Sequence, residues 1–537
     1  MDRLGAMAAH HLYGFVDPKY YEPLSRYRIT PDHYNALRQL LPDTWVLERG
    51  DVWLQARVKS GTRGRNTTLP AQGFKIHVSS TPAHALRLFE LVVPVCVEHD
   101  VEFKAAADPV LLRLINSKTQ ERGYSGKFMT IYPPGLDAFT ELIERLYQRT
   151  RDEPAEGPYI LSDRRYRDSK VIFYRYGGFR PAWRLNVDGT KSSFLVSPSG
   201  EHVADQRLPY FHLPAWVSDP FGQEPGEQSH VDDAHVDEAD GDDVQGDDAT
   251  GQASAAGTGA TLLKDRFLIE GAMTFSNAGG VYHGTDQHTL KPVVVKEARR
   301  LTNCFTSGDR TWDAVDVLRH EYDVLRHLEG LAFVPRPVDL FQEWEHTFLV
   351  EERVDGVAFH DFWAREEVIL APYIHREGRV EQFAPKFRDV AARLIRMVEE
   401  VHARGVVLGD LSPNNVLIDP GTLHMWFIDF ESAARDDDMA EMLAYGARWG
   451  TPGFLHPERS SRDRLLPRDD WYATAMILYS CALPATALFG LNPVAQDRML
   501  DSLVELGLPA PVKSVVSCLT AGAVEEAKSV LAEWETG

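Results

Sequence analysis

The sequence has little cysteine, no export signal and no excess of positive charge, and each shortage excludes a class of protein. Its 537 residues include only four cysteines, which are widely spaced and form no C-x-x-C pair: Cys96, Cys304, Cys481 and Cys518. This spacing fits neither a disulfide framework nor an ordinary zinc site, and it indicates reduced thiols in a cytoplasm. The N-terminus has no continuous apolar core after a basic start, so the sequence predicts no secretory signal.

Basic residues are outnumbered, with 57 Lys and Arg against 79 Asp and Glu, which gives a formal net charge of −22. A chain of this charge repels a phosphate backbone at long range, so nucleic acid is not expected as a partner. Twelve of the acidic residues, and no Lys or Arg, lie between positions 219 and 248. The surrounding stretch 218–260 is poor in aliphatic side chains and predicts an acidic, disordered linker between one domain at 1–217 and another at 261–537.

One apolar run imitates a membrane span. Residues 471–496 contain no charged side chain, and this run is long enough to cross a bilayer. The run is interrupted by Pro484, carries several hydroxyl groups and lacks a basic flank. It therefore predicts a buried helix followed by a turn, and no membrane partner.

The periodicity of apolar residues predicts an α+β chain. Before the linker, β-rich runs at 45–58, 73–80 and 127–134 alternate with helical runs near 82–98 and 136–150, as in an α/β enzyme body. After the linker, three strands are expected between 266 and 300, a strand pair near 334–352 and helices elsewhere from 311 onward. This order predicts a small β lobe followed by a larger α lobe.

The most specific signal is GDLSPNNVLID at 409–419, followed by WFIDFES at 426–432. Transfer of a γ-phosphoryl group needs a carboxylate that positions the acceptor, metal ligands and a cation on the nucleotide phosphates. Asp410, Asn415 and Asp429 supply the first two, and their spacing resembles the catalytic loop and metal-binding motif of protein kinases. The resemblance implies a bilobal kinase-like domain that uses ATP or GTP with Mg²⁺.

Other parts of the kinase pattern lie where the resemblance predicts them. Lys296 ends the strand PVVVK, and Glu321 follows on a helix, which suits the ion pair that orients a phosphate-binding lysine. Asp470 would begin the buried helix of the large lobe. The turn over the phosphates and the hinge that contacts the base would be formed by the backbones of Gly279, Gly280, Glu352 and Val354.

The sequence also departs from the kinase pattern. Leu408 and Gly409 replace the usual His and Arg, so activation by loop phosphorylation is not expected. Ser412 stands where the loop lysine is usual, which removes a charge near the γ-phosphate, and Glu431 replaces the glycine after Asp-Phe. A degenerate, structural pseudokinase is the alternative, but it does not explain why all four core polar groups are present.

The first domain contains a K-x-H strand and a group of basic residues. Lys75 and His77 lie on one face of the strand GFKIHVSS because side chains repeat with period two, and Lys104 follows 27 residues after His77. Composition alone would make the basic residues solvated surface. The K-x-H strand, the later lysine and a cluster of arginines resemble bacterial phosphothreonine lyases. The segments YYEPLSRY, GFKIHVS, SGKF and YRYG together resemble the lyase domain of class III lanthipeptide synthetases, and the kinase motif resembles the second domain of that family.

The resemblance to these lyases implies roles for the basic residues. Lys104 would remove the Cα proton of a phosphorylated residue, and His77 would protonate the departing oxygen. The remaining residues would hold the phosphate through paired hydrogen bonds: Lys75, Arg122, Lys127, Arg165 and Arg175.

A kinase joined to such a lyase predicts dehydration of Ser and Thr in a ribosomal precursor peptide, whose leader docks while its core visits both sites. The products would be dehydroalanine and dehydrobutyrine. Class III synthetases continue into a cyclase domain that does not follow residue 537. Three explanations are open: the chain is truncated, a separate cyclase completes the reaction, or the dehydrated peptide is the product. The alternatives are a lyase effector that acts on phosphoproteins with the kinase as its regulator, and a catalytically dead scaffold that binds peptide.

Overall fold

The structure is a computed structural model that describes residues 28–222 and 261–536, with short gaps. The gaps are residues 51, 60–68, 119, 121, 181, 186, 188, 190, 206–207, 308–309, 366–369, 440–441, 444–449, 487–488, 490–491 and 493. The segment YYEPLSRY and the predicted linker from residue 223 onward lie outside the described residues.

The N-terminal domain is built on an antiparallel sheet of seven strands in the order β1-β2-β4-β5-β3-β7-β6. Its strands are β1 (Trp45–Arg49), β2 (Trp53–Val58), β3 (Gln72–Val78), β4 (Phe103–Ala106), β5 (Met129–Ile131), β6 (Arg164–Arg165) and β7 (Ile172–Gly178). The helices are α2 (Asp32–Leu40), α3 (Ala85–Glu98), α4 (Pro109–Ile115) and α5 (Leu136–Thr150). A smaller sheet follows, with β8 (Trp183–Leu185), β9 (Lys191–Val196) and β10 (His202–Ala204). The predicted alternation of strands and helices is confirmed.

Alternation along the strands divides this sheet into an apolar face and a polar face. Phe74 and Ile76 of β3 are buried, and Phe74 stacks on Phe139 of α5 with ring centroids 4.9 Å apart. The next residues along β3, Lys75 and His77, therefore project from the opposite face. The helix-covered face supplies the core, and polar side chains lie on the other face.

The packed part of the N-terminal domain extends beyond the predicted boundary at residue 217. Asp219 accepts hydrogen bonds from Arg164 at 2.5 Å and from the hydroxyl of Tyr174 at 3.0 Å. Phe221 packs against Tyr166 and Tyr174, with centroid distances of 4.9 and 5.4 Å. Because an aromatic anchor follows the acidic residue, the first five positions assigned to the linker belong to the folded domain.

The kinase domain begins with a small lobe whose sheet has the order β11-β12-β13-β14-β18-β17. The strands are β11 (Thr261–Leu263), β12 (Phe267–Ser276), β13 (Gly279–Asp286), β14 (Lys291–Arg299), β17 (Pro337–Glu343) and β18 (His346–Glu352), and a short hairpin joins β15 (Phe305–Ser307) to β16 (Arg310–Trp312). Helix α6 (Ala314–Leu328) begins at a capping box in which Asp313 accepts hydrogen bonds from Val315 and Asp316. The three strands and the strand pair predicted for this lobe are confirmed.

The large lobe is mostly helical, with α7 (Phe359–Arg365), α8 (Arg379–His402), α10 (Pro467–Ala482), α11 (Val494–Glu505), α12 (Ala510–Thr520) and α13 (Val524–Thr536). Short strands carry the catalytic segments: β19 (Val357–Ala358), β20 (Val406–Val407), β21 (Val416–Ile418), β22 (Met425–Phe427) and β23 (Ala434–Arg435). The uncharged run forms α10, which is buried along almost its whole length and ends before Pro484. No helix among the described residues has the length and hydropathy that a membrane crossing needs.

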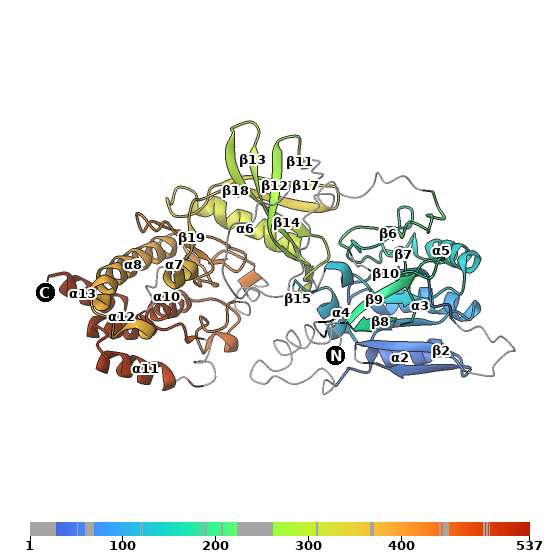
Figure 1. Cartoon of the computed structure of the whole chain (residues 1–537), viewed down its shortest axis with the longest axis horizontal. Coiled ribbons are helices and arrows are strands. Elements are labelled where there is room, and N and C mark those ends of the chain that lie inside the picture. Colours follow the sequence, from blue (N-terminus) through green and yellow to red (C-terminus); the bar gives the residue numbers. More distant parts are fainter. Residues whose placement is uncertain are drawn as a thin grey trace.

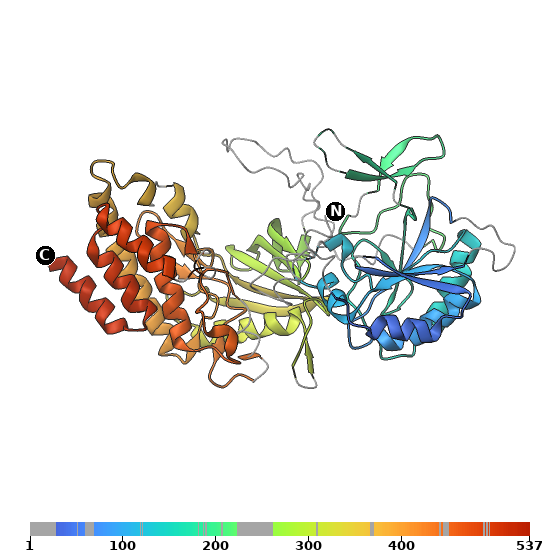
Figure 2. The same ribbon diagram turned by 90° about the horizontal axis from the view of Figure 1, so that it is seen from below.

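The small lobe lies between the N-terminal domain and the large lobe (Figure 1), and the view from below shows the same order (Figure 2). Polar contacts join the N-terminal domain to the kinase domain across this junction. Three ion pairs measure 2.5 to 3.1 Å: Lys118 with Glu431, Arg122 with Glu297, and Arg300 with Glu156. The two domains therefore share a built interface in addition to the chain that connects them.

Candidate active sites

The kinase domain brings together the lysine and glutamate predicted to orient the nucleotide. Lys296 of β14 lies 2.5 Å from Glu321 of α6 and 3.5 Å from Glu351 of β18. Burial opposes the charge of Lys296, but Glu321, Glu351 and Asp429 outweigh it and raise the pKa of its ammonium group. These carboxylates therefore favour the charged form of Lys296. Glu351 was missed by the sequence reasoning because only its place on a neighbouring strand brings it to the site.

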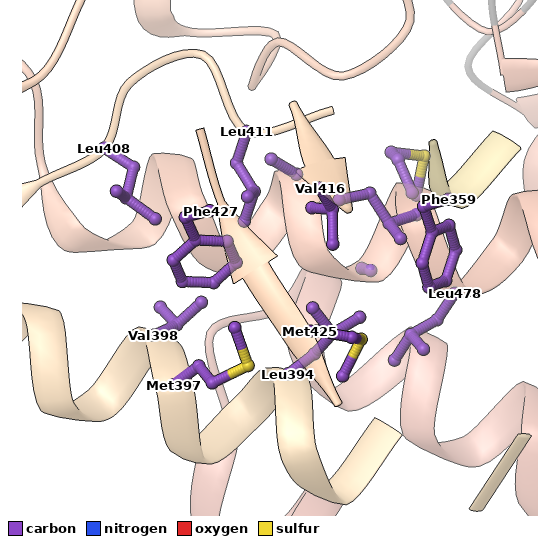
Figure 3. Packing of buried hydrophobic residues seen from close by; sticks show 14 of the residues in the cluster. Phe359, Leu394, Met397, Val398, Leu408, Leu411, Val416, Met425, Phe427 and Leu478 are labelled. Atoms are coloured by element: carbon purple, nitrogen blue, oxygen red, sulfur yellow. The ribbon is translucent and has the colours of Figure 1, made fainter. Parts of the chain in front are cut away.

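Thr451 makes two hydrogen bonds to one carboxylate oxygen of Asp410 in the catalytic loop. The backbone and the hydroxyl of Thr451 donate them at 2.7 and 2.8 Å. Leu408 and Leu411, on either side of Asp410, are buried in the core of the large lobe together with side chains of α8 and β22 (Figure 3). Asp470, in the first turn of α10, accepts hydrogen bonds from the backbones of Leu408 and Gly409 at 2.7 and 2.9 Å. The loop is thus fixed by apolar anchors and by one buried carboxylate.

Asn415 and Asp429 suit a magnesium ion by the chemistry of their donors. The amide nitrogen of Asn415 donates to the carbonyl of Asp410 at 2.8 Å, which turns its amide oxygen the other way. Asp429 follows β22 with a left-handed backbone, φ 63°, in a strained conformation typical of functional residues. Carboxylate and amide oxygens are the ligands that Mg²⁺ prefers, so the residues present fit the ion.

The residues predicted for the hinge and for the phosphate-covering turn lie on or beside the expected strands. Glu352 ends β18, and Val354 follows it half-buried. Gly279 and Gly280 begin β13, and a Cβ on Gly279 would lie 1.7 Å from the carbonyl oxygen of Glu297. Strand packing therefore requires glycine at position 279, whatever role the turn has toward a nucleotide.

In the N-terminal domain, strand register places the proposed acid and base on one face. Thr130 of β5 is directly opposite both Lys104 of β4 and His77 of β3, so the three side chains share a face. Neighbouring strands are about 4.8 Å apart, which separates the Cα atoms of Lys104 and His77 by about 10 Å. The ammonium group of Lys104 lies 4.3 Å from the ring centroid of Trp53 on β2. The two residues predicted to transfer protons therefore lie on the strands at either side of β5.

A second row on the same face is basic. Lys75 of β3 is directly opposite Arg175 of β7. A Cβ on Gly177 would lie 3.1 Å from the guanidinium of Arg175 and 3.4 Å from the ammonium of Lys75, so the absent side chain at this position lets the cations converge. Arg175 is buried and ion-pairs with Asp205 at 2.6 Å. Converging cations of this kind suit a dianion such as phosphate.

His77 has a buried acidic partner that the sequence reasoning missed. Its Nδ1 contacts a carboxylate oxygen of Asp163, and both side chains are almost fully buried. Burial lowers the pKa of His77 to about 3, although Asp163 works in the opposite direction. Burial alone would raise the pKa of Asp163, but His77 and Lys127 outweigh it and hold it below the usual range. Asp163 therefore carries a negative charge that orients the imidazole.

The other three predicted phosphate ligands lie in two different surroundings, one inside the N-terminal domain and one at the domain interface. Lys127 is buried with its ammonium group 3.8 Å from a carboxylate oxygen of Asp163, and it donates a hydrogen bond to the hydroxyl of Ser162 at 3.0 Å. Arg122 and Arg165 instead form ion pairs with the kinase domain, Arg122 with Glu297 and Arg165 with Glu345. The structure thus places these two arginines at the domain interface, and their binding of phosphate stays a prediction.

Comparisons with known proteins agree with this division. The family model described as "RamC, N-terminal domain" matches residues 33–232, and the protein kinase domain model matches residues 275–504. The "Probable SapB synthase" of Streptomyces coelicolor is 32% identical over 93% of this chain and 49% of its own length. The "Serine/threonine-protein kinase PknL" of Mycobacterium tuberculosis is 26% identical over 49% of this chain and 62% of its own length.

Fold and site together define a two-domain protein that contains a protein kinase domain. The chain is similar, more particularly, to proteins that join a RamC-type N-terminal domain to such a kinase, and the predicted resemblance to the class III lanthipeptide synthetases is confirmed. The chain spans about half the length of the first of these relatives and under two thirds of the other.

Proposed function

We propose that the protein dehydrates Ser and Thr residues of a ribosomal precursor peptide in two steps. The kinase domain phosphorylates the hydroxyl group, and the N-terminal domain, acting as a lyase, eliminates the phosphate to give dehydroalanine or dehydrobutyrine. The observation that supports this most strongly is the shared sheet face of Lys104 and His77 with the paired cations Lys75 and Arg175, in one chain with a complete set of kinase polar groups.

In the first step, the chain's own residues position the reactants. Asp410 accepts the proton of the substrate hydroxyl, and its two bonds to Thr451 keep the carboxylate in place. Lys296 contacts the phosphates of ATP or GTP. Asn415 and Asp429 would hold Mg²⁺, which when bound would supply positive charge beside the phosphates.

In the second step, Lys104 in its neutral form takes the Cα proton of the phosphorylated residue. The electron pair of that bond forms the Cα–Cβ double bond as the Cβ–O bond breaks. His77 gives a proton to the departing phosphate oxygen from Nε2, because Asp163 occupies Nδ1. The substrate phosphate is a dianion near neutral pH and raises the proton affinity of the imidazole when it binds.

The location and partners follow from this proposal. A precursor peptide would supply a leader that docks and a core that visits both sites, and we expect the reaction in the cytoplasm. Joining both sites on one chain raises the effective concentration of the phosphorylated intermediate at the lyase. Cyclisation would be the task of a separate cyclase or of further sequence.

The test is incubation of the full chain with a candidate precursor and MgATP or MgGTP, followed by mass spectrometry. We expect loss of water from the peptide with the wild-type protein, no change with Asp410→Asn, and accumulation of phosphopeptide with Lys104→Ala or His77→Ala. Full water loss with either lyase variant would show that these residues are wrongly assigned. Activity on folded phosphoproteins without precursor would favour the effector alternative, and an unchanged peptide mass would favour a scaffold.

A further inference from the structure

A short segment of the N-terminal domain lies against the turn that should cover the nucleotide phosphates. The turn joins β12 to β13, and its residue Asn277 is fully buried. The backbone of Asn277 donates to the carbonyl of Lys118 at 2.8 Å, and its side chain donates to the carbonyl of Ser117 at 2.9 Å. Nearby, the backbone of Asn303 donates to the carbonyl of Asn116 at 2.7 Å. Residues 116–118 therefore fix the position of this turn.

The side chain of Lys118 continues from this segment to the metal-binding motif. Its ammonium group lies 2.5 Å from a carboxylate oxygen of Glu431, two residues after Asp429. The charges of Glu431, Asp429 and Glu321 all act on Lys118. The side chain is 42% exposed, so a ligand can reach it.

Among the described residues of the kinase domain, few cations lie at this site. Ser412 stands where the loop lysine is usual, and its buried hydroxyl has no hydrogen-bond partner among the described residues. Lys296 interacts electrostatically with Glu321, Glu351 and Asp429, whereas Glu431 interacts with Lys118. A nucleotide brings further negative charge, so an additional cation at this position stabilises the bound state.

A purely structural role for Lys118 does not account for its placement. An ion pair as exposed as Lys118 with Glu431 contributes about 0–1 kcal/mol to stability. The interface already has the buried pair of Arg122 with Glu297, whose side chains are 11% and 1% exposed. The domains are thus held together without the side chain of Lys118, and a ligand can reach its exposed ammonium group beside Glu431.

We propose that Lys118 of the N-terminal domain is part of the nucleotide site of the kinase domain, where its ammonium group contacts the nucleotide phosphates in place of the lysine absent at Ser412. This inference rests on the proposed phosphotransfer. It makes the phosphorylation half of the reaction dependent on a residue of the other half.

The test is calorimetric titration of the full chain with MgATP and, separately, with adenosine, which lacks phosphates. We expect Lys118→Met to weaken MgATP binding about tenfold, the effect of one charge-assisted hydrogen bond, and to leave adenosine binding unchanged. Lys118→Arg keeps the charge and should restore most of the MgATP affinity.

Arg300→Met is the matched control, because it removes another ion pair of the same interface, 2.6 Å from Glu156, outside the nucleotide site. It should leave both affinities unchanged. Equal MgATP affinity of Lys118→Met and wild type, or a parallel loss of adenosine affinity, would overturn the role of Lys118 alone. Failure of the wild-type chain to bind MgATP would instead overturn the proposed function, and this inference with it.

Discussion

Replacement of Asp163 by Asn tests whether the buried carboxylate acts through His77. The substitution keeps the shape of the side chain and removes its charge, so the imidazole loses a charge-assisted hydrogen bond in a buried site. A hydrogen bond to a charged group contributes about 1.5–3 kcal/mol. If the loss of this hydrogen bond raises the activation barrier by the same amount, the rate of elimination falls about 10- to 150-fold. The pKa of His77 is already lowered to about 3 by burial, and loss of Asp163 lowers it further.

The assay supplies a synthetic phosphoserine peptide directly, so that the kinase is not needed, and follows the release of inorganic phosphate against pH. The limb on which the rate falls with rising pH, as His77 loses its proton, should move to lower pH in Asp163→Asn. Asp168→Asn is the control, because it makes the same chemical change at an exposed carboxylate that accepts a 2.5 Å hydrogen bond from Tyr147. An Asp163→Asn protein with the wild-type rate and an unmoved pH profile would refute the positioning role.

Further predictions concern both domains. Asp410→Asn should abolish phosphorylation but leave elimination from a supplied phosphopeptide intact, as measured by separate assays of the two steps. Thr451→Val removes one of two hydrogen bonds to Asp410 and should slow phosphorylation about tenfold with little change in KM for ATP, measured by initial rates. Between pH 6.5 and about 3, His77 is neutral in the folded state but protonated in the unfolded state, so its contribution to stability falls as the pH falls. Between pH 7 and 5 the free energy of unfolding of the wild type should therefore fall by about 2 kcal/mol more than that of His77→Gln. Hydrogen exchange of the β3 amides measures this difference. Burial raises the pKa of the Cys96 and Cys481 thiols, so both should resist iodoacetamide until the protein unfolds, as detected by peptide mass mapping.

Features with a local period or a fixed spacing were predictable from the sequence. Lys75 and His77 lie two residues apart on a strand, so alternation predicts that they project from the same face. The register of β3 shows that this is the polar face. The step between Asp410 and Asn415 likewise indicates one loop, because both lie within a single turn between short strands. The roles assigned to these residues stay predictions.

Features that depend on distant segments were not predictable. Asp163 lies 86 residues from His77, and no spacing links the two. An arginine has the same charge whether it binds phosphate or forms an ion pair at an interface. The sequence therefore cannot show that Arg122 and Arg165 pair with Glu297 and Glu345. Their ion pairs become visible only once the relative placement of the domains is known.

The junction between the domains is chemically asymmetric. Backbone carbonyls of the N-terminal domain accept the hydrogen bonds of Asn277, Asn303 and Arg299, and Arg299 reaches the carbonyl of Tyr159 at 2.6 Å. A carbonyl is present whatever side chain its residue carries, whereas each side-chain donor on the kinase face requires its own amino-acid type. As far as these hydrogen bonds are concerned, Ser117 and Tyr159 are therefore freer to change than Arg299. Chimaeras that exchange the N-terminal domain between relatives should instead need to keep Lys118 and Arg122, whose side chains form the ion pairs with Glu431 and Glu297.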